Sequence, residues 1–102
     1  MAIYPGRDAR RARILVVDDD PLLLRVLSRI LTHAGYQAQT ANSVDAARAE
    51  LKGPYFDAVL TDICLPDGTG LDVLAAAREH DPCLQVVVLT GEGRGFCSWL
   101  DL

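Results

Sequence analysis

The chain has 102 residues, of which 50% are hydrophobic and 24% are charged, a composition typical of one small globular domain. No apolar run approaches the roughly 20 residues of a membrane span. Three cysteines without a Cys-x-x-Cys pair argue against a disulfide framework and against a cysteine zinc site, so we expect a cytoplasmic protein without membrane contact.

The net charge of −4 is unevenly distributed along the chain. Residues 1–13 contain four arginines and one aspartate, a charge of +3, whereas the remaining 89 residues contain six basic and thirteen acidic residues, a charge of −7. The sequence therefore predicts a basic flexible arm over residues 1–13. Because the acidic body repels phosphates, we expect no direct nucleic-acid contact by this domain.

Short apolar runs alternate with segments of helical periodicity after the arm. The β-branched run at 14–17 predicts a strand that is buried on both faces. Asp20 can cap a helix that begins at Pro21 and that Gly35 ends. Residues 36–41 form a weak, partly alternating strand, which suits the edge of a sheet.

The same alternation continues through the second half of the chain. Ser43 can cap a second helix that runs through Leu51, and a third strand follows over 58–60. The turn-rich segment 65–70 leads to a third helix that an Asp-Pro pair ends, and 86–89 forms the fourth strand.

Strands that alternate with helices through short loops predict a parallel α/β sheet. If the first helix covers one face and the later two helices cover the other, right-handed crossovers give the strand order 2-1-3-4. This is a flavodoxin-like doubly wound sheet, in which ligands bind beyond the carboxyl ends of the strands at the switch point, here between the first and third strands.

Three carboxylates follow the strands on either side of that switch point. Asp18 and Asp19 end the first strand and Asp62 ends the third, and neighbouring strands lie about 4.8 Å apart. Oxygen ligands of this kind favour Mg²⁺, beside which a carboxylate can accept a phosphoryl group. The spacing alone is equally compatible with Asp19 and Asp20 capping the helix and Asp62 starting a turn. Thr90 adds a hydroxyl at the same edge.

Three motifs stand in order at these strand ends: ILVVDDDP at 14–21, DAVLTDICLPDGTG at 57–70 and VVLTG at 87–91. Together they resemble the receiver domains of response regulators in two-component signalling, over roughly residues 14–94. The residues at 67–70 and 90–93 are similar to those of response regulators that control ATPase-type transcriptional activators.

The resemblance implies that Asp62 accepts a phosphoryl group from a sensor histidine kinase. Asp18 and Asp19 would hold Mg²⁺ together with Asp62 and the backbone carbonyl of Cys64, and Thr90 would hydrogen-bond the phosphoryl group as the switch hydroxyl. The chain would then be a phosphoacceptor signalling domain in transcription regulation, and not an enzyme.

The sequence departs from the family's pattern after Thr90. The family continues with a helix, a fifth strand that ends in a lysine, and a last helix, whereas the sole lysine here is Lys52. We therefore interpret 14–94 as an incomplete receiver domain that lacks the fifth strand and the last helix. Residues 95–102 are interpreted as a tail foreign to the family, and phosphorylation is expected to be impaired.

An uncovered sheet face is a further expectation. Four strands make a sheet about 19 Å wide, whereas one helix covers about 10 Å, so the first helix cannot cover its whole face. The edge of the fourth strand would also be open and apolar, which predicts self-association.

Two other functions remain open from the sequence. One is an interaction module that keeps the receiver shape without being phosphorylated, which the missing lysine favours. The other is a fragment of a haloacid-dehalogenase-like phosphatase, because Asp67-Gly68-Thr69 resembles part of the Asp-x-Asp-Gly-Thr motif of that family. The nucleophile of such an enzyme would stand at position 65, which is Leu65 in this chain.

Overall fold

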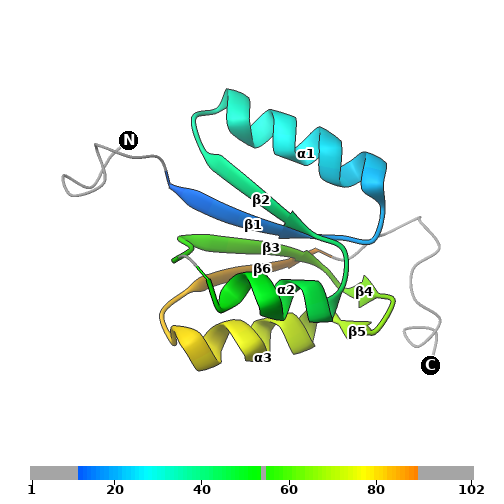
Figure 1. The fold of residues 1–102 in the computed structure, drawn as a ribbon, viewed down its shortest axis with the longest axis vertical. Helices are drawn as coiled ribbons and strands as arrows, with labels where there is room; N and C mark the ends of the chain where they lie inside the picture. The colour runs from blue at the N-terminus through cyan, green and yellow to red at the C-terminus, as the bar shows by residue number, and fades with distance from the viewer. Residues whose placement is uncertain (1–11, 54, 90–102) are drawn as a thin grey trace.

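A computed structural model describes residues 12–53 and 55–89 of the chain. The elements follow one another in this order: β1 (Arg13–Val17), α1 (Pro21–His33), β2 (Gln37–Ala41), α2 (Val44–Leu51), β3 (Ala58–Asp62), β4 (Cys64–Leu65), β5 (Gly68–Thr69), α3 (Gly70–His80) and β6 (Gln85–Leu89). Figure 1 shows the long strands as a central layer with helices on both sides. None of the described helices is both long and apolar enough to cross a membrane.

The central sheet is parallel and has the order β2-β1-β3-β6. In terms of its four long strands this is the order 2-1-3-4, so the predicted fold class is confirmed. Val17 at the end of β1 pairs with Ala41 of β2 and with Thr61 of β3. The carboxyl ends of three neighbouring strands therefore lie level with one another.

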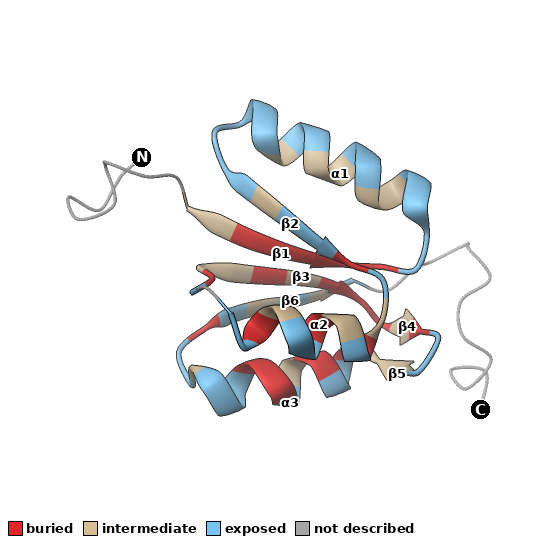
Figure 2. Cartoon of the chain, in the orientation of Figure 1, coloured by how far each residue is buried: buried red, intermediate tan, exposed pale blue. Residues whose placement is uncertain are grey.

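The helices divide between the two faces as predicted. α1 contacts β2 and β1 on one face, whereas α2 and α3 contact each other and the opposite face (Figure 1). The buried residues, red in Figure 2, lie mainly on the central strands and on α2 and α3, so the core lies between the sheet and the α2–α3 pair. Leu15, Val59 and Val73 are fully enclosed there, which identifies this layer as the hydrophobic core.

Side chains near the helix starts explain where each helix begins. The Asp20 carboxylate accepts hydrogen bonds from the amides of Leu22 and Leu23, as expected for an N-cap before Pro21. The Ser43 hydroxyl caps α2 in the same way. The predicted caps of the first two helices are therefore confirmed.

The segment 65–70 is more regular than a turn. β4 and β5 pair in antiparallel fashion, with Cys64 opposite Thr69 and Leu65 opposite Gly68, so the segment is a small hairpin. The Thr69 side chain then caps α3, and Asp72 completes a capping box. The chain thus passes from β3 to α3 through a braced connection.

α1 covers only part of its face of the sheet. All thirteen residues of α1 remain at least partly accessible, and the side chain of Leu22 is 65% exposed. On β6, Val87 and Leu89 are 45% and 43% exposed, so the expectation of an incompletely covered face holds for the described residues.

Several predictions concern residues that the structure leaves undescribed. Thr90 and the tail at 95–102 lie outside the described residues, and so do residues 1–11 of the predicted arm. Arg13, the last residue assigned to the arm, begins β1 and donates from its backbone amide to the Asp57 carboxylate at 2.7 Å. The bounds of the arm and of the tail stay predictions.

Candidate metal centre

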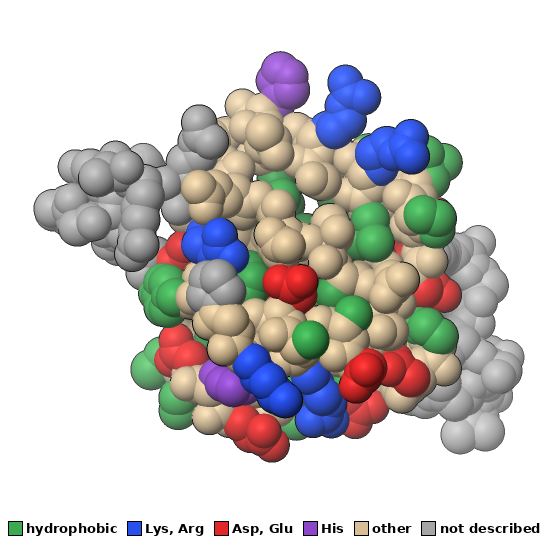
Figure 3. Space-filling model, viewed as in Figure 1, with side chains coloured by type: hydrophobic (Ala, Val, Ile, Leu, Met, Phe, Trp, Pro, Cys, Tyr) green, Lys and Arg blue, Asp and Glu red, His purple; other side chains and the backbone are tan. Residues whose placement is uncertain are grey.

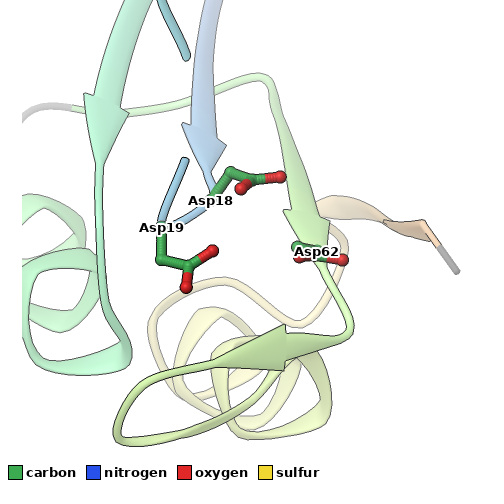
Figure 4. A group of neighbouring side chains, drawn as sticks. All are labelled: Asp18, Asp19 and Asp62. Atoms are coloured by element: carbon green, nitrogen blue, oxygen red, sulfur yellow. The ribbon is translucent and has the colours of Figure 1, made fainter. Parts of the chain in front are cut away.

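Three acidic side chains meet at the carboxyl ends of β1 and β3. Asp18 and Asp19 directly follow β1, and Asp62 is the last residue of β3. Each of them offers a carboxylate oxygen, and these oxygens all lie within 4.8 Å of one another. Figure 4 shows the three side chains grouped between the two strand ends. The structure therefore brings together acids that stand up to 44 positions apart in the sequence.

Two of these carboxylates are buried. Asp18 is 4% exposed and Asp62 is 8% exposed, whereas Asp19 lies open to solvent. The Asp18 amide donates to the Ala41 carbonyl at 3.1 Å, which extends the pairing of β1 with β2 past the last strand residue. Oδ1 of Asp18 accepts the Asp20 amide at 2.9 Å, so this carboxylate is held in one orientation.

Asp62 is held from both its backbone and its side chain. The Ile63 amide donates to Oδ1 of Asp62 at 2.8 Å and also to the Leu89 carbonyl at 3.0 Å. The hydroxyl of Thr61, itself fully buried, donates to the Asp62 carbonyl at 3.0 Å. A Cβ added at Gly70 would stand 2.5 Å from that same carbonyl oxygen, so only glycine lets α3 begin this close to β3.

The donor set fits a small hard cation. Carboxylate oxygens are the ligands that Mg²⁺ prefers, and oxygens bound to one Mg²⁺ at about 2.1 Å stand roughly 3 to 4 Å apart. Small side-chain rotations would therefore bring the three oxygens to a common ion. Carboxylates this close also repel one another, and a divalent cation would offset that repulsion.

Cys64 follows two residues after Asp62 and begins β4, where it pairs with Thr69. This position is close in the chain to the acidic cluster. The role of its backbone carbonyl as a further metal ligand stays a prediction, and Thr90 lies outside the described residues.

Lys52 lies at the other end of the fold. It is the C-cap residue of α2 and, with Tyr55 and Leu84, lines a cavity of about 290 Å³ near the starts of β3 and β6. The acidic cluster lies instead at the carboxyl ends of the strands. The expectation that Lys52 is poorly placed to serve this site is confirmed.

Asp67 is a residue to which the sequence assigned no role at this site. It lies between β4 and β5, and its carboxylate accepts the amides of Val44 at 2.7 Å and of Asp45 at 3.0 Å. These two bonds, with a smaller contribution from the positive charge of Arg48, lower the pKa of Asp67 below its ordinary value of 3.8. An aspartate before a glycine signals a turn, but nothing in the sequence reveals a partner 22 or 23 positions away.

Comparisons with known proteins identify the family. Residues 14–96 match the model of the response regulator receiver domain. The chain is 38% identical over 85 residues to the probable transcriptional regulatory protein TcrX of Mycobacterium tuberculosis, which covers 83% of this chain and 36% of TcrX. It is 40% identical over 81 residues to the alginate biosynthesis transcriptional regulatory protein AlgB of Pseudomonas aeruginosa, which covers 79% of this chain and 18% of AlgB. The chain thus spans less than half the length of these curated relatives.

Solved structures agree with this assignment. The fold is similar to that of a CheY-like receiver domain from Methanospirillum hungatei JF-1, with a TM-score of 0.77 and 32% identity over 83% of this chain and 68% of that one. It is also similar to the chemotaxis response regulator CheY4 of Vibrio cholerae, with a TM-score of 0.76 and 29% identity over 81% of this chain and 71% of that one. With the same strand order and an acidic pocket at the switch point, the chain belongs to the response regulator receiver domain family.

Proposed function

We propose that this domain is a phosphoacceptor, in which Asp62 takes a phosphoryl group from a phosphohistidine of a sensor histidine kinase. Mg²⁺ would be held by Asp18, Asp19 and Asp62 and by the backbone carbonyl of Cys64. The observation that carries the proposal is the convergence of three carboxylate oxygens within 4.8 Å at the switch point of the sheet.

The contacts of Asp62 suggest how the side chain would react. Oδ1 accepts the Ile63 amide, which fixes the plane of the carboxylate and makes Oδ2 our choice of nucleophile. Oδ2 forms the new bond to phosphorus while the bond from phosphorus to the imidazole nitrogen breaks. The nitrogen leaves with the electron pair and takes a proton from solvent. When bound, Mg²⁺ would offset the negative charge between the carboxylates and the transferred group.

Thr90 completes the proposed machinery as the hydroxyl that would hydrogen-bond the phosphoryl group on Asp62. Thr90 follows Leu89, the last residue of β6, and Leu89 pairs with Asp62 across the sheet. The register brings Leu89, the residue before Thr90 in the sequence, to the same edge as the phosphoacceptor, and this supports the proposed role of Thr90.

The proposed setting is cytoplasmic, in the regulation of transcription. Receiver domains in general pair with histidine kinases, and TcrX and AlgB are both named as transcriptional regulatory proteins. On the face shown in Figure 3, basic and acidic side chains are mixed over the α2–α3 side, whereas the charged side chains over α1 are basic. The net charge of −4 supports our proposal that the domain itself makes no direct contact with nucleic acid.

Phosphorylation by a small donor tests the proposal directly. The chain is incubated with acetyl phosphate and Mg²⁺, and its intact mass is measured. We expect one phosphoryl adduct that is labile at alkaline pH, that is absent from Asp62→Asn and that requires Mg²⁺. Asp81→Asn is the matched control, because Asp81 is the C-cap residue of α3 and its side chain accepts the Cys83 amide in the following turn. A wild-type chain that acquires no adduct would contradict the proposal.

An interaction module that is not phosphorylated is the second candidate. It is favoured by the position of Lys52, the sole lysine of the chain, at the end of the fold remote from the acidic cluster. Mg²⁺ binding without any adduct would support this candidate. The phosphatase alternative has no such support, because position 65, where its nucleophile would stand, is a buried leucine in β4.

A further inference from the structure

The turn of the β4–β5 hairpin is tied to the start of α2. Both carboxylate oxygens of Asp67 accept backbone amides there, Oδ1 from Val44 and Oδ2 from Asp45. The next amide, that of Ala46, is satisfied by the Ser43 hydroxyl at 3.0 Å. The first turn of a helix leaves its amides without partners inside the helix, and a carboxylate at this end also interacts favourably with the helix dipole. The contact is therefore a charge-assisted one between two segments that are distant in the chain.

The hairpin also lies close to both neighbouring helices. A Cβ added at Gly68 would stand 2.6 Å from Oδ2 of Asp72 in α3 and 3.0 Å from Cγ2 of Val44 in α2. The Thr69 amide donates to Oδ2 of Asp72 at 2.9 Å. The turn is thus held on the α3 side by Asp72 and on the α2 side by Asp67.

The base of the hairpin is joined to the acidic cluster. The Ile63 carbonyl accepts the Gly70 amide at 2.9 Å, and the Ile63 amide donates to Oδ1 of Asp62 and to β6. Cys64 lies between this fixed base and the turn, in a strand of two residues. The contacts at the two ends of the segment therefore help to hold Cys64 in place, and Asp67 attaches the turn to α2.

We propose that Asp67 is a positioning residue, which ties the β4–β5 hairpin to the start of α2 and so fixes Cys64 beside the acidic cluster. The inference rests on the proposed function, since it assigns to Asp67 the placement of a proposed metal ligand. Coupling between two sites is reciprocal. Mg²⁺ bound at the cluster therefore slows hydrogen exchange of the Val44 and Asp45 amides.

Three variants of the full chain separate this role from plain stabilisation of α2. Asp67→Asn keeps one acceptor oxygen, so the chain still folds, but it loses the negative charge and one bond. Ser43→Ala removes the other cap of α2 without touching the hairpin. Asp81→Asn makes the same chemical change as the first variant, in a turn that follows α3.

The first measurement is made without metal, by amide exchange and amide chemical shifts. Asp67→Asn speeds exchange at Val44 and Asp45 and shifts the amides of Cys64 and Thr69. Ser43→Ala speeds exchange at Ala46 and leaves the hairpin amides unchanged.

In the second measurement, Mg²⁺ is titrated into each protein and its affinity is measured by calorimetry. We expect Asp67→Asn to lower the affinity about threefold to tenfold, near the lower end for residues that orient metal ligands. Ser43→Ala and Asp81→Asn keep the wild-type affinity.

Two results would overturn the inference. One is an Asp67→Asn variant with wild-type Mg²⁺ affinity and unshifted Cys64 and Thr69 amides. The other is a Ser43→Ala variant that loses as much affinity as Asp67→Asn, because the effect would then be one of helix stability alone. A wild-type chain that binds no Mg²⁺ contradicts the proposed function, and the metal-free measurement then still decides whether Asp67 holds the hairpin.

Discussion

At the scale of single residues, the acidic pocket depends on backbone amides that hold its two buried carboxylates. Asp18 and Asp62 are both buried, and each has a carboxylate oxygen that accepts a backbone amide near the end of its strand. Burial of ionised groups is costly unless hydrogen bonds or a cation compensate for it. The two strand ends therefore maintain an arrangement that Mg²⁺ would stabilise further.

Gly70 offers a test of how tightly the end of β3 is packed. In Gly70→Ala, the new methyl group would meet the Asp62 carbonyl, as well as Val88 Cγ1 at 3.1 Å and Thr61 Cγ2 at 3.2 Å. We expect the free energy of unfolding to fall by about 1 to 3 kcal/mol, as for other overpacked sites. Urea unfolding measures this change. Gly53→Ala is the control, since its nearest contact would be an ordinary 3.4 Å. Equal stability of the two variants would contradict the packing argument.

The residues at the pocket differ in how far the sequence could predict them. Asp18, Asp19 and Asp62 follow strands whose order could be deduced, so their convergence could be predicted from the topology. The contact of Asp67 with α2 could not, because it depends on how the hairpin folds over a helix that lies earlier in the chain. Local turn propensity contains no information about such a partner.

At the scale of the elements, periodicity and capping residues predicted all the long strands and helices to within one or two residues. The exception is the pair β4 and β5, since strands of two residues show no alternation that a sequence pattern could reveal. The structure shows that this short hairpin, rather than a plain turn, connects β3 to α3. The contacts of this hairpin with α2 depend on tertiary packing, so local sequence patterns could not predict them.

The pH dependence of α2 follows from its contact with Asp67. The pKa of this carboxyl is lowered by the amides of Val44 and Asp45 and, to a smaller extent, by the positive charge of Arg48. A group with a lowered folded-state pKa stabilises the fold fully above its unfolded pKa and loses that effect as the pH falls through the folded value. The stability that wild type has over Asp67→Asn should therefore be constant above about pH 5 and shrink below about pH 4.

Urea unfolding of both proteins between acid and neutral pH measures this difference. The same series with Asp81→Asn serves as the control, because the Asp81 carboxylate accepts an amide in the turn after α3 and not one at the start of α2. If the stability difference between wild type and Asp67→Asn stayed constant down to the lowest pH of the series, the charge of Asp67 would not stabilise α2.

At the scale of the whole molecule, one side of the sheet has an apolar surface in contact with solvent. Val86 packs against the core, so the alternation of the strand directs Val87 and Leu89 to the α1 face. Pro21, Arg25, Ser28 and Arg29 line a cavity with Thr40 of β2, which identifies the flank of α1 that lies toward β2. The exposed residues of the opposite flank are Leu22, Val26 and Ile30.

Self-association is the expected consequence of this surface and of the edge of β6. Exposed apolar patches and open strand edges promote contacts between chains. We expect the molar mass measured by light scattering to rise with concentration in the wild type, and Val87→Lys to reduce this rise. Gln85→Lys adds the same charge at the start of the same strand, at a residue that is already polar, and should have a smaller effect. A wild-type chain that stays monomeric throughout would contradict the expectation.

The Ile63 amide is shared between two acceptors, and this has a consequence for β6 at the edge of the sheet. One proton lies between the Asp62 side chain and the Leu89 carbonyl. Formation of an acyl phosphate on Asp62 would withdraw negative charge from its carboxyl oxygens, and the Ile63 amide would then favour the Leu89 carbonyl. Modification of the Asp62 side chain would in this way strengthen the hydrogen bond from the Ile63 amide to the last residue of β6. The chemical shift of the Ile63 amide proton would report this change.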